Sequence, residues 1–354
     1  MIRFSRNFST LQTSLMRRRT AADLQVRISD AAREVATGRK TDVYRSLGLG
    51  AAKVLDLRAS IDRTDAFITG NTQLQNRFDT MADTLGTLRK TAEAVLALAV
   101  PNRDRPTLTA GELQMAARAA LDTIIGQLNA SYQGSVLFGG IETDRLPLQS
   151  WETPADATGL SPRQVLEDIL AGGIGNSADA AAKAAEVAAA FANSSSVAAR
   201  NFDATFYNGA PQSATRLSAR IDETSVLDYG IQANDPAYAG ILQGLAMLAA
   251  TDVSLIADEA AYGEWTRVAV GALSQGAAGA LAAEATLGTR QARLEGVIAA
   301  QETRQNIYKS QVVGLEGVDT YEAASRISLL ESQLQASYAV TARLSNLSFL
   351  YFMD

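Results

Sequence analysis

The sequence predicts a mainly α protein: long antiparallel helices in a coiled-coil-like rod, with a small mixed α/β outer domain inserted in the middle. Three observations lead to this prediction. Apolar residues repeat at heptad spacing in the first and last thirds of the 354 residues, as in long packed helices. Alanine, which favours helix, supplies much of the 47% hydrophobic content, while aromatic residues make up only 6%. Proline, glycine and serine gather between residues 147 and 177, which predicts an irregular middle.

Two apolar stripes run along the segment that precedes Gly38. The first stripe has heptad spacing and consists of Phe8, Leu11, Leu15, Ala22 and Val26. The second consists of Leu24, Ile28, Ala31 and Val35. Two stripes predict a helix that is contacted on more than one side. We expect Gly38 to cap this helix and residues 38–50 to form an irregular connection.

The longest heptad pattern predicts a coiled-coil-like helix over residues 51–99, about 70 Å long at roughly 1.5 Å per residue. Polar residues interrupt the pattern, and Pro101 and Pro106 are expected to end the helix. The interruptions are Thr64, Asn71 and Gln75. The apolar positions are Val54, Leu57, Ile61, Ile68, Phe78, Met81, Leu85, Leu88, Ala92 and Val95.

A further helix is predicted to begin at Thr109, because Glu112 follows it at the spacing of a capping box. This helix is expected to run to about Tyr132. The sequence GSVLFGG at 134–140 then predicts a short strand and a turn.

The middle of the chain is expected to combine short helices with small antiparallel strands. Helices are predicted from the Ser161-Pro162 pair, over 178–192, and from Asn234 to Ala250. Strands are predicted within FDATFYNG (202–209), TRLSARI (215–221) and SVLDYGIQ (225–232).

The last third returns to long helices, interrupted by GLEGVDT at 314–320. Its heptad positions are Leu287, Leu294, Ile298, Tyr308, Val312 and Leu315, with polar breaks at Gln291, Gln301 and Gln305. We expect the seams at 54–95 and 287–315 to pair antiparallel, since each would otherwise expose its apolar face. The breaks at Asn71, Gln75, Gln301 and Gln305 either set the register of this pairing or are simply solvated.

The absence of cysteine and histidine from the sequence excludes several classes of catalytic and metal-binding function. With no cysteine and no histidine, the chain lacks thiolate chemistry, disulfides, the commonest general base and the commonest metal ligand. The sequence also shows no metal-ligand spacing and no phosphate-binding loop. We therefore expect no enzyme activity, no cofactor and no metal.

Charge and hydropathy exclude two kinds of partner. A net charge of −6 argues against nucleic-acid binding. No apolar run approaches the roughly 20 residues that span a bilayer, so we expect no membrane insertion. Residues 1–20 lack the pattern of a cleavable signal peptide, so any export is expected to use another route.

Both ends of the sequence are unusually apolar, with MIRFSRNFSTL at 1–11 and LSNLSFLYFMD at 344–354. Exposed apolar patches usually mark interaction sites, whereas chain ends are normally solvated. The ends are therefore expected either to be buried between subunits or to fold back on the chain's own core. The residues predicted to form an assembly interface are Phe4, Phe8, Leu11, Leu15, Val26, Leu334, Val340, Leu344, Leu347, Phe349, Leu350, Tyr351 and Phe352.

Four stretches in order carry a family resemblance. They are EVATGRK at 34–40, GSVLFGG at 134–140, LEGVDTYEAASRISLLESQLQASYAV at 315–340 and the terminal LSNLSFLYFM. Together they resemble the flagellin family over residues 1–140 and 235–354. The aromatic ending is more similar to members of that family at the junction of hook and filament than to filament subunits.

The resemblance implies an axial protein of the bacterial flagellum, exported without a cleavable signal through the flagellar type III channel. It implies three parts: an inner terminal coiled-coil domain (1–50 with 313–354), a helical rod domain (51–140 with 233–312) and an outer inserted domain (141–232). The implied partners are copies of the chain itself, a neighbouring hook-associated protein, flagellin, and a cytoplasmic export chaperone on the C-terminal helix. A filament flagellin and a cytosolic coiled-coil scaffold are the alternative interpretations.

Overall fold

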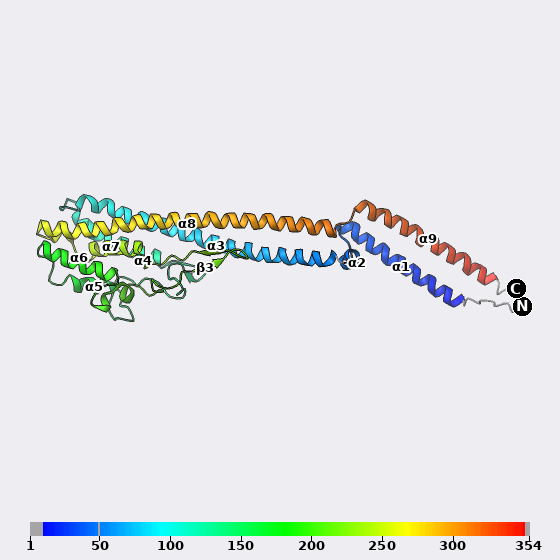
Figure 1. The fold of residues 1–354 in the computed structure, drawn as a ribbon, viewed down its shortest axis with the longest axis horizontal. Helices are drawn as coiled ribbons and strands as arrows, with labels where there is room; N and C mark the ends of the chain where they lie inside the picture. Colours follow the sequence, from blue (N-terminus) through cyan, green and yellow to red (C-terminus); the bar gives the residue numbers. More distant parts are fainter. Residues whose placement is uncertain (1–9, 49, 351–354) are drawn as a thin grey trace. The chain divides into compact units, whose positions relative to one another are not determined.

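The computed structural model describes residues 10–48 and 50–350 (Figure 1). The chain divides into two compact units, which are treated separately here. The terminal unit comprises residues 1–66 and 300–354, and the central unit comprises residues 67–299. The predicted division into three domains remains a prediction.

The terminal unit is built around a pair of helices from the two ends of the chain, which lie side by side (Figure 1). Its elements are α1 (Thr10–Thr37), α2 (Val43–Leu47), the start of α3 (Gly50–Ala99), the end of α8 (Glu259–Glu316) and α9 (Thr320–Leu350). Gly38 adopts a φ of +66°, and its N–H donates to the Glu34 carbonyl over 2.8 Å, so its predicted role as a C-cap is confirmed. The expected irregular connection contains one short helix, α2.

The central unit is mainly helical, with short strands between its helices. Its remaining helices are α4 (Ala110–Leu128), α5 (Pro162–Ile169), α6 (Ser177–Phe191) and α7 (Pro236–Ala250). Short 3₁₀ turns are η1 (Val100–Asn102), η2 (Ala198–Arg200) and η4 (Val253–Leu255). The described strands pair antiparallel in two hairpins, β1 (Ser131–Tyr132) with β2 (Ser135–Val136) and β3 (Ser218–Arg220) with β4 (Val226–Asp228). The mainly α fold class with long helices and a small mixed region is therefore confirmed.

Within the central unit, α3 and α8 run antiparallel, as the two heptad seams predict. Gln291 of α8 donates to Asp79 of α3 over 2.8 Å, and Arg89 of α3 donates to Glu284 of α8 over 2.9 Å. The heptad positions of α3 from Phe78 to Val95 are all buried. Apolar periodicity thus identified the packed face of this helix correctly.

The polar breaks in the seams are mostly buried, so the alternative that they are simply solvated is wrong for them. In the terminal unit, Thr64, Gln301 and Gln305 are buried, and Gln305 donates to Asp65 over 2.9 Å. In the central unit Asn71 is buried as well. Buried polar groups that are hydrogen-bonded across helices are suited to fixing a register, which remains the prediction for these residues.

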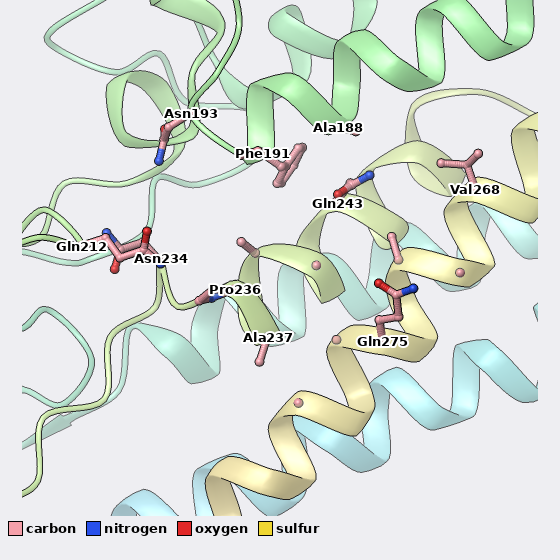
Figure 2. Close-up of a pocket in the computed structure, with 17 residues that line it drawn as sticks. Ala188, Phe191, Asn193, Gln212, Asn234, Pro236, Ala237, Gln243, Val268 and Gln275 are labelled. Carbon is pink, nitrogen blue, oxygen red and sulfur yellow. The ribbon is translucent and has the colours of Figure 1, made fainter.

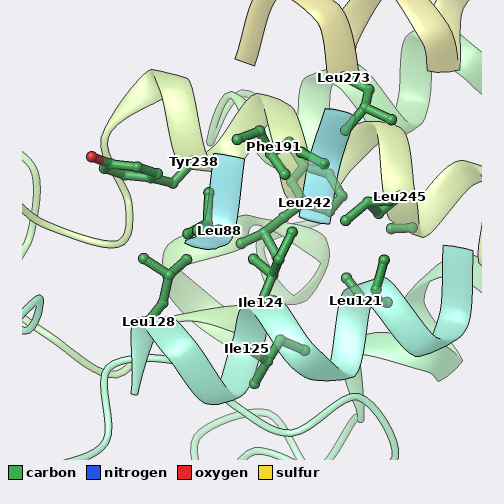
Figure 3. Close-up of a cluster of buried hydrophobic side chains, with 14 of the residues drawn as sticks. Leu88, Leu121, Ile124, Ile125, Leu128, Phe191, Tyr238, Leu242, Leu245 and Leu273 are labelled. Atoms are coloured by element: carbon green, nitrogen blue, oxygen red, sulfur yellow. The ribbon is translucent and has the colours of Figure 1, made fainter. Parts of the chain in front are cut away.

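The core of the central unit lies where α4 and α7 meet α3, α6 and α8. Figure 3 shows Leu121, Ile124 and Leu128 of α4 directed toward Leu242 of α7, with Leu88 of α3 and Leu273 of α8 near them. The fully buried Trp265 donates its indole N–H to the Met247 carbonyl over 3.2 Å, which satisfies its one polar group.

The prediction of a strand over 202–209 is wrong. Phe202–Phe206 forms a π-helical turn, η3, and only Tyr207 makes an isolated bridge, to Leu148. The turn places Phe202 and Phe206 against Phe191 of α6, with ring centroids 5.4 and 5.0 Å apart. Aromatic packing against a distant helix therefore overrides the local alternation of residues.

The helix predicted to reach Tyr132 ends earlier, at Leu128. Residues 131–132 instead pair with 135–136 around Gln133 and Gly134, whose φ values are +51° and +83°. Positive φ at both central residues is characteristic of the tight turns that match the twist of a hairpin. The strand and turn expected at 134–140 are therefore present, but the hairpin starts within the predicted helix.

Candidate assembly surface

The inner faces of α1 and α9 bury small and aliphatic residues against each other. Leu24 and Ala31 of α1 and Ala323 and Leu330 of α9 are buried. Leu24 and Ala31 belong to the second apolar stripe of α1, and each pair is seven residues apart, which places its members on one face of its helix. The alanines allow the two helices to approach closely.

Polar contacts flank this apolar seam. Gln25 donates to the Tyr338 hydroxyl over 3.3 Å, and Arg326 donates to Glu34 over 3.4 Å and to Glu322 over 3.0 Å. Arg326 is 48% exposed, and an ion pair of an exposed side chain contributes about 0–1 kcal/mol. They orient the pair more than they stabilise it.

The described side chains of the first apolar stripe of α1, those of Leu15, Ala22 and Val26, are exposed. Val26 is 60% exposed, and Leu15 and Met16 are also exposed. Leu24 and Val26 are two residues apart, which places them about 200° apart around a helix of 3.6 residues per turn. One face of α1 is thus used within the chain, and the other presents aliphatic side chains to solvent.

Helix α9 also exposes apolar side chains, on more than one of its faces. Leu329 is 59% exposed, and Val340, Tyr338 and Tyr321 are exposed as well. Leu329 and Val340 are eleven residues apart, close to three full helical turns, so they share a face. Leu334 is only half-buried.

The predicted interface residues fall into three groups. Leu15, Val26 and Val340 are exposed, and Leu334 is half-buried. The helices include Leu11, Leu344, Leu347, Phe349 and Leu350, but their side chains lie outside what the structure describes. Phe4, Phe8, Tyr351 and Phe352 lie outside the described residues altogether.

Sequence reasoning missed several exposed apolar residues of this surface: Met16, Tyr321, Leu329 and Tyr338. The spacing of eleven between Leu329 and Val340 was the available signal, because eleven residues complete about three turns of an ideal helix. The aromatic pair Tyr321 and Tyr338 had no such signal, since the two lie on different faces.

A groove of about 550 Å³ follows the seam between α1 and α9. Its walls combine an aliphatic side chain from each helix, Leu24 and Val340, with charged groups of α1 at Arg17, Asp23 and Arg27. A groove with this mixture suits a helix that carries both apolar and charged side chains.

The two connections that lead into the helix pair are hydrogen-bonded to each other. Lys40 N–H donates to the Glu316 carbonyl over 2.9 Å, and Val318 N–H donates to the Gly38 carbonyl over 3.1 Å. The side chain of Glu316 is only 2% exposed and accepts from the half-exposed Arg58, with Nη2 2.5 Å from Oε1. The connection that precedes α9 is therefore joined to the one that follows α1 by main-chain bonds, and the Arg58–Glu316 pair joins α3 to the end of α8.

Two other kinds of site are absent from the described part of the chain. It holds no group of three acidic side chains that could bind a metal ion. Its helices include none long and apolar enough to cross a membrane.

These features define a class: a long-helix α protein whose first and last helices, α1 and α9, pair with each other and expose apolar side chains to solvent. Two family models match the sequence. The bacterial flagellin N-terminal helical region matches residues 8–143, and the bacterial flagellin C-terminal helical region matches residues 272–353. Together the two matches cover more than half of the sequence, and the chain belongs to the flagellin family.

Comparison with solved structures agrees with this fold. A candidate flagellar hook-associated protein from Vibrio parahaemolyticus is similar with a TM-score of 0.50 and 12% sequence identity. The alignment covers 75% of this chain and 96% of that one. At this identity the likeness shows a shared fold. No curated protein matches the sequence.

Proposed function

We propose that this protein is a structural axial component of the bacterial flagellum that joins the hook to the filament and assembles through its terminal helices. The observation that supports the proposal best is the apolar outer surface of the α1–α9 pair. In a subunit by itself, Val26 and Leu329 remain more than half exposed although they belong to regular apolar patterns. Packing against neighbouring copies would bury them.

Burial of these apolar side chains between subunits would contribute favourable free energy to assembly. Full burial of a large aliphatic side chain contributes about 1.5–3 kcal/mol, so the exposed residues of α1 and α9 together offer several such increments. Ordering of side chains at the interface and the loss of translational freedom oppose this gain. Assembly by many repeated weak contacts fits a structure that must grow one subunit at a time.

The proposed partners follow from the family and from the surface. They are copies of the chain itself, a neighbouring hook-associated protein and flagellin, with neither nucleic acid nor inserted membrane among them. Before export, a cytoplasmic chaperone would cover the C-terminal helix over about 320–352, because its exposed face includes Tyr321, Leu329 and Val340. The protein would work without cofactor or catalysis, and its export would need no cleaved signal peptide.

The three domains predicted from the sequence are retained in this proposal. Residues 1–50 with 313–354 would form the inner coiled coil, 51–140 with 233–312 the surrounding helical domain, and 141–232 the outer part.

A filament flagellin is the second candidate, since the flagellin family models alone fit both roles. The aromatic ending FLYFM, at 349–353, favours the junction. The fold shared with a candidate hook-associated protein agrees with that choice.

Immunogold electron microscopy of flagellated cells, with antibody raised to residues 141–232, tests the proposal. Label confined to a short zone between hook and filament is the expected result. Label along the entire filament would identify a flagellin instead. Absence of label from flagella, with the protein retained inside cells, would replace both with a cytosolic scaffold.

A further inference from the structure

The central unit contains a cavity of about 790 Å³ that has no part in the helix pair of the terminal unit. It lies between the end of α6, helix α7 and helix α8 (Figure 2). Its volume is within the range of about 300–1,000 Å³ that is typical of small-molecule sites. The cavity is therefore large enough for a ligand of several rings.

The lining of the cavity is uncharged, and most of it is alanine, glycine and other apolar residues. Of the 17 described residues that line it, none is acidic or basic, in a chain that is 20% charged. Its polar groups are instead five side-chain carboxamides, Asn193, Gln212, Asn234, Gln243 and Gln275. Figure 2 shows Gln212 and Asn234 together on one side, with Gln243 on α7 and Gln275 on α8.

The chemistry of the lining restricts the ligand. An anionic or cationic ligand would be desolvated in the cavity without a counter-charge, which is strongly unfavourable. An apolar helix of another subunit would cover the carboxamides and leave them unpaired. The walls of α6, α7 and α8 present no strand edge to which an extended peptide could add.

A ligand rich in hydroxyl groups satisfies these conditions. Each carboxamide offers both a donor and an acceptor, and a hydroxyl group is likewise both. The alanines and glycines between the carboxamides leave flat C–H surface against which a sugar ring can lie. We propose that this cavity binds a neutral oligosaccharide, with the exposed carboxamides of Asn193, Gln212 and Gln275 forming hydrogen bonds to its hydroxyl groups.

Gly271 of α8 provides a way to fill the cavity without disturbing the fold. It lines the cavity, and a Cβ added there would meet no atom within 4 Å. By contrast, a Cβ on Gly276 in the same lining would lie 2.5 Å from the Ile241 backbone nitrogen. Gly271→Leu therefore projects a side chain into open space, and leucine favours helix more than glycine does.

Isothermal titration of the full-length monomer with maltotriose and with triacetylchitotriose tests the proposal. At least one of these neutral sugars is expected to bind the unmodified protein. Gly271→Leu is expected to weaken that binding at least about tenfold, and Gln275→Ala, at an exposed position of the lining, about threefold to tenfold. The matched control is Gly288→Leu, an exposed position on α8 outside the cavity where a Cβ also meets no atom within 4 Å. Its affinity should equal that of the unmodified protein.

The possible outcomes separate the alternatives. Binding of neither sugar, or equal binding by Gly271→Leu and the unmodified protein, overturns the proposal. A monomer–oligomer equilibrium that Gly271→Leu abolishes, with no sugar binding, would make the cavity an interface between copies and also overturn it.

Discussion

Asn71 and Ile221, 150 residues apart in sequence, are joined by a hydrogen bond from the Asn71 side-chain Nδ2 to the Ile221 main-chain oxygen, 2.8 Å long. Both residues are buried, at 3% and 0% exposure. Ile221 directly follows β3, so this bond attaches the β3–β4 hairpin to the long helix α3. A polar residue in a heptad seam thus also binds a hairpin from the middle of the chain.

Replacing Asn71 by alanine should lower the free energy of unfolding by about 1–3 kcal/mol, because the buried Ile221 oxygen loses this donor and the seam loses volume. Urea denaturation followed by circular dichroism measures the change. Asn76→Ala, at an exposed position on the same helix, should change stability by less than about 0.5 kcal/mol. Equal stabilities of the two variants would contradict the anchoring role.

Two glycines of α8 should respond in opposite directions to alanine. A Cβ on Gly276 would lie 2.5 Å from the Ile241 nitrogen and 2.7 Å from the Ala237 oxygen, both main-chain atoms of α7. Gly276→Ala should therefore destabilise by about 1–3 kcal/mol, since α7 must move. Gly271→Ala meets no atom within 4 Å and should stabilise by up to about 1 kcal/mol through helix propensity. Thermal unfolding distinguishes them, and shifts of the same sign would refute the close packing of α7 on α8.

Tyr262 should make stability depend on alkaline pH. Burial raises its pKa to about 12, and its hydroxyl donates to the Asn102 carbonyl over 2.5 Å. The unfolded chain releases this proton near pH 10, so the folded state binds it more tightly. The resulting stability is complete below about pH 10 and is lost as the pH rises toward about 12.

Tyr262→Phe tests this dependence when the free energy of unfolding is measured against pH. The variant should be less stable at neutral pH by about 0.5–1.5 kcal/mol, the contribution of one hydrogen bond. Its loss of stability above about pH 10 should be smaller than that of the unmodified protein. A decline remains in both, since burial also raises the pKa of Tyr207 and Tyr238. Parallel curves would show that Tyr262 titrates alike in both states.

The outer face of α1 should be needed for assembly and dispensable for folding. Val26→Asp places a charge on a 60% exposed position, so the helix content of the monomer should be unchanged. Recovery of the variant in flagella sheared from cells should fall at least about tenfold, since one aliphatic contact is lost and a charge is buried at each interface. Ala32→Asp, also exposed on α1, is the control and should be recovered normally. Normal recovery of Val26→Asp would remove this face from the interface.

The long helices could be predicted from the sequence because their apolar periodicity extends over many turns. The heptads from Phe78 to Val95 mark the buried face of α3, and Gly38 marks the end of α1. The two stripes of α1 indicated two contacted faces, and the structure shows which one packs on α9, since Leu24 is buried and Val26 is exposed.

The middle of the chain was harder to predict because distant contacts decide its local structure. The π-helical turn at Phe202–Phe206 packs on Phe191, which belongs to the preceding helix α6 and lies outside the local pattern of the turn. Likewise, no local sequence pattern predicts the hydrogen bond between Asn71 and Ile221, or the burial of Asn234 at the wall of the cavity. Side chains beyond Arg343 are not described, so the aromatic ending stays a prediction from sequence.

The antiparallel pairing of α3 and α8 has a consequence for how such a sequence can change over generations. Gln75 pairs with Glu295 and Asp79 with Gln291, so four steps forward along one helix match four steps back along the other. Inserting one residue into either helix would rotate everything beyond it by about 100° and separate every later pair. The paired stretches of the two helices are therefore matched in length, and an insertion within one requires a compensating insertion in the other. Insertions and deletions of single residues are therefore expected in the loops that lie between α3 and α8 in the sequence.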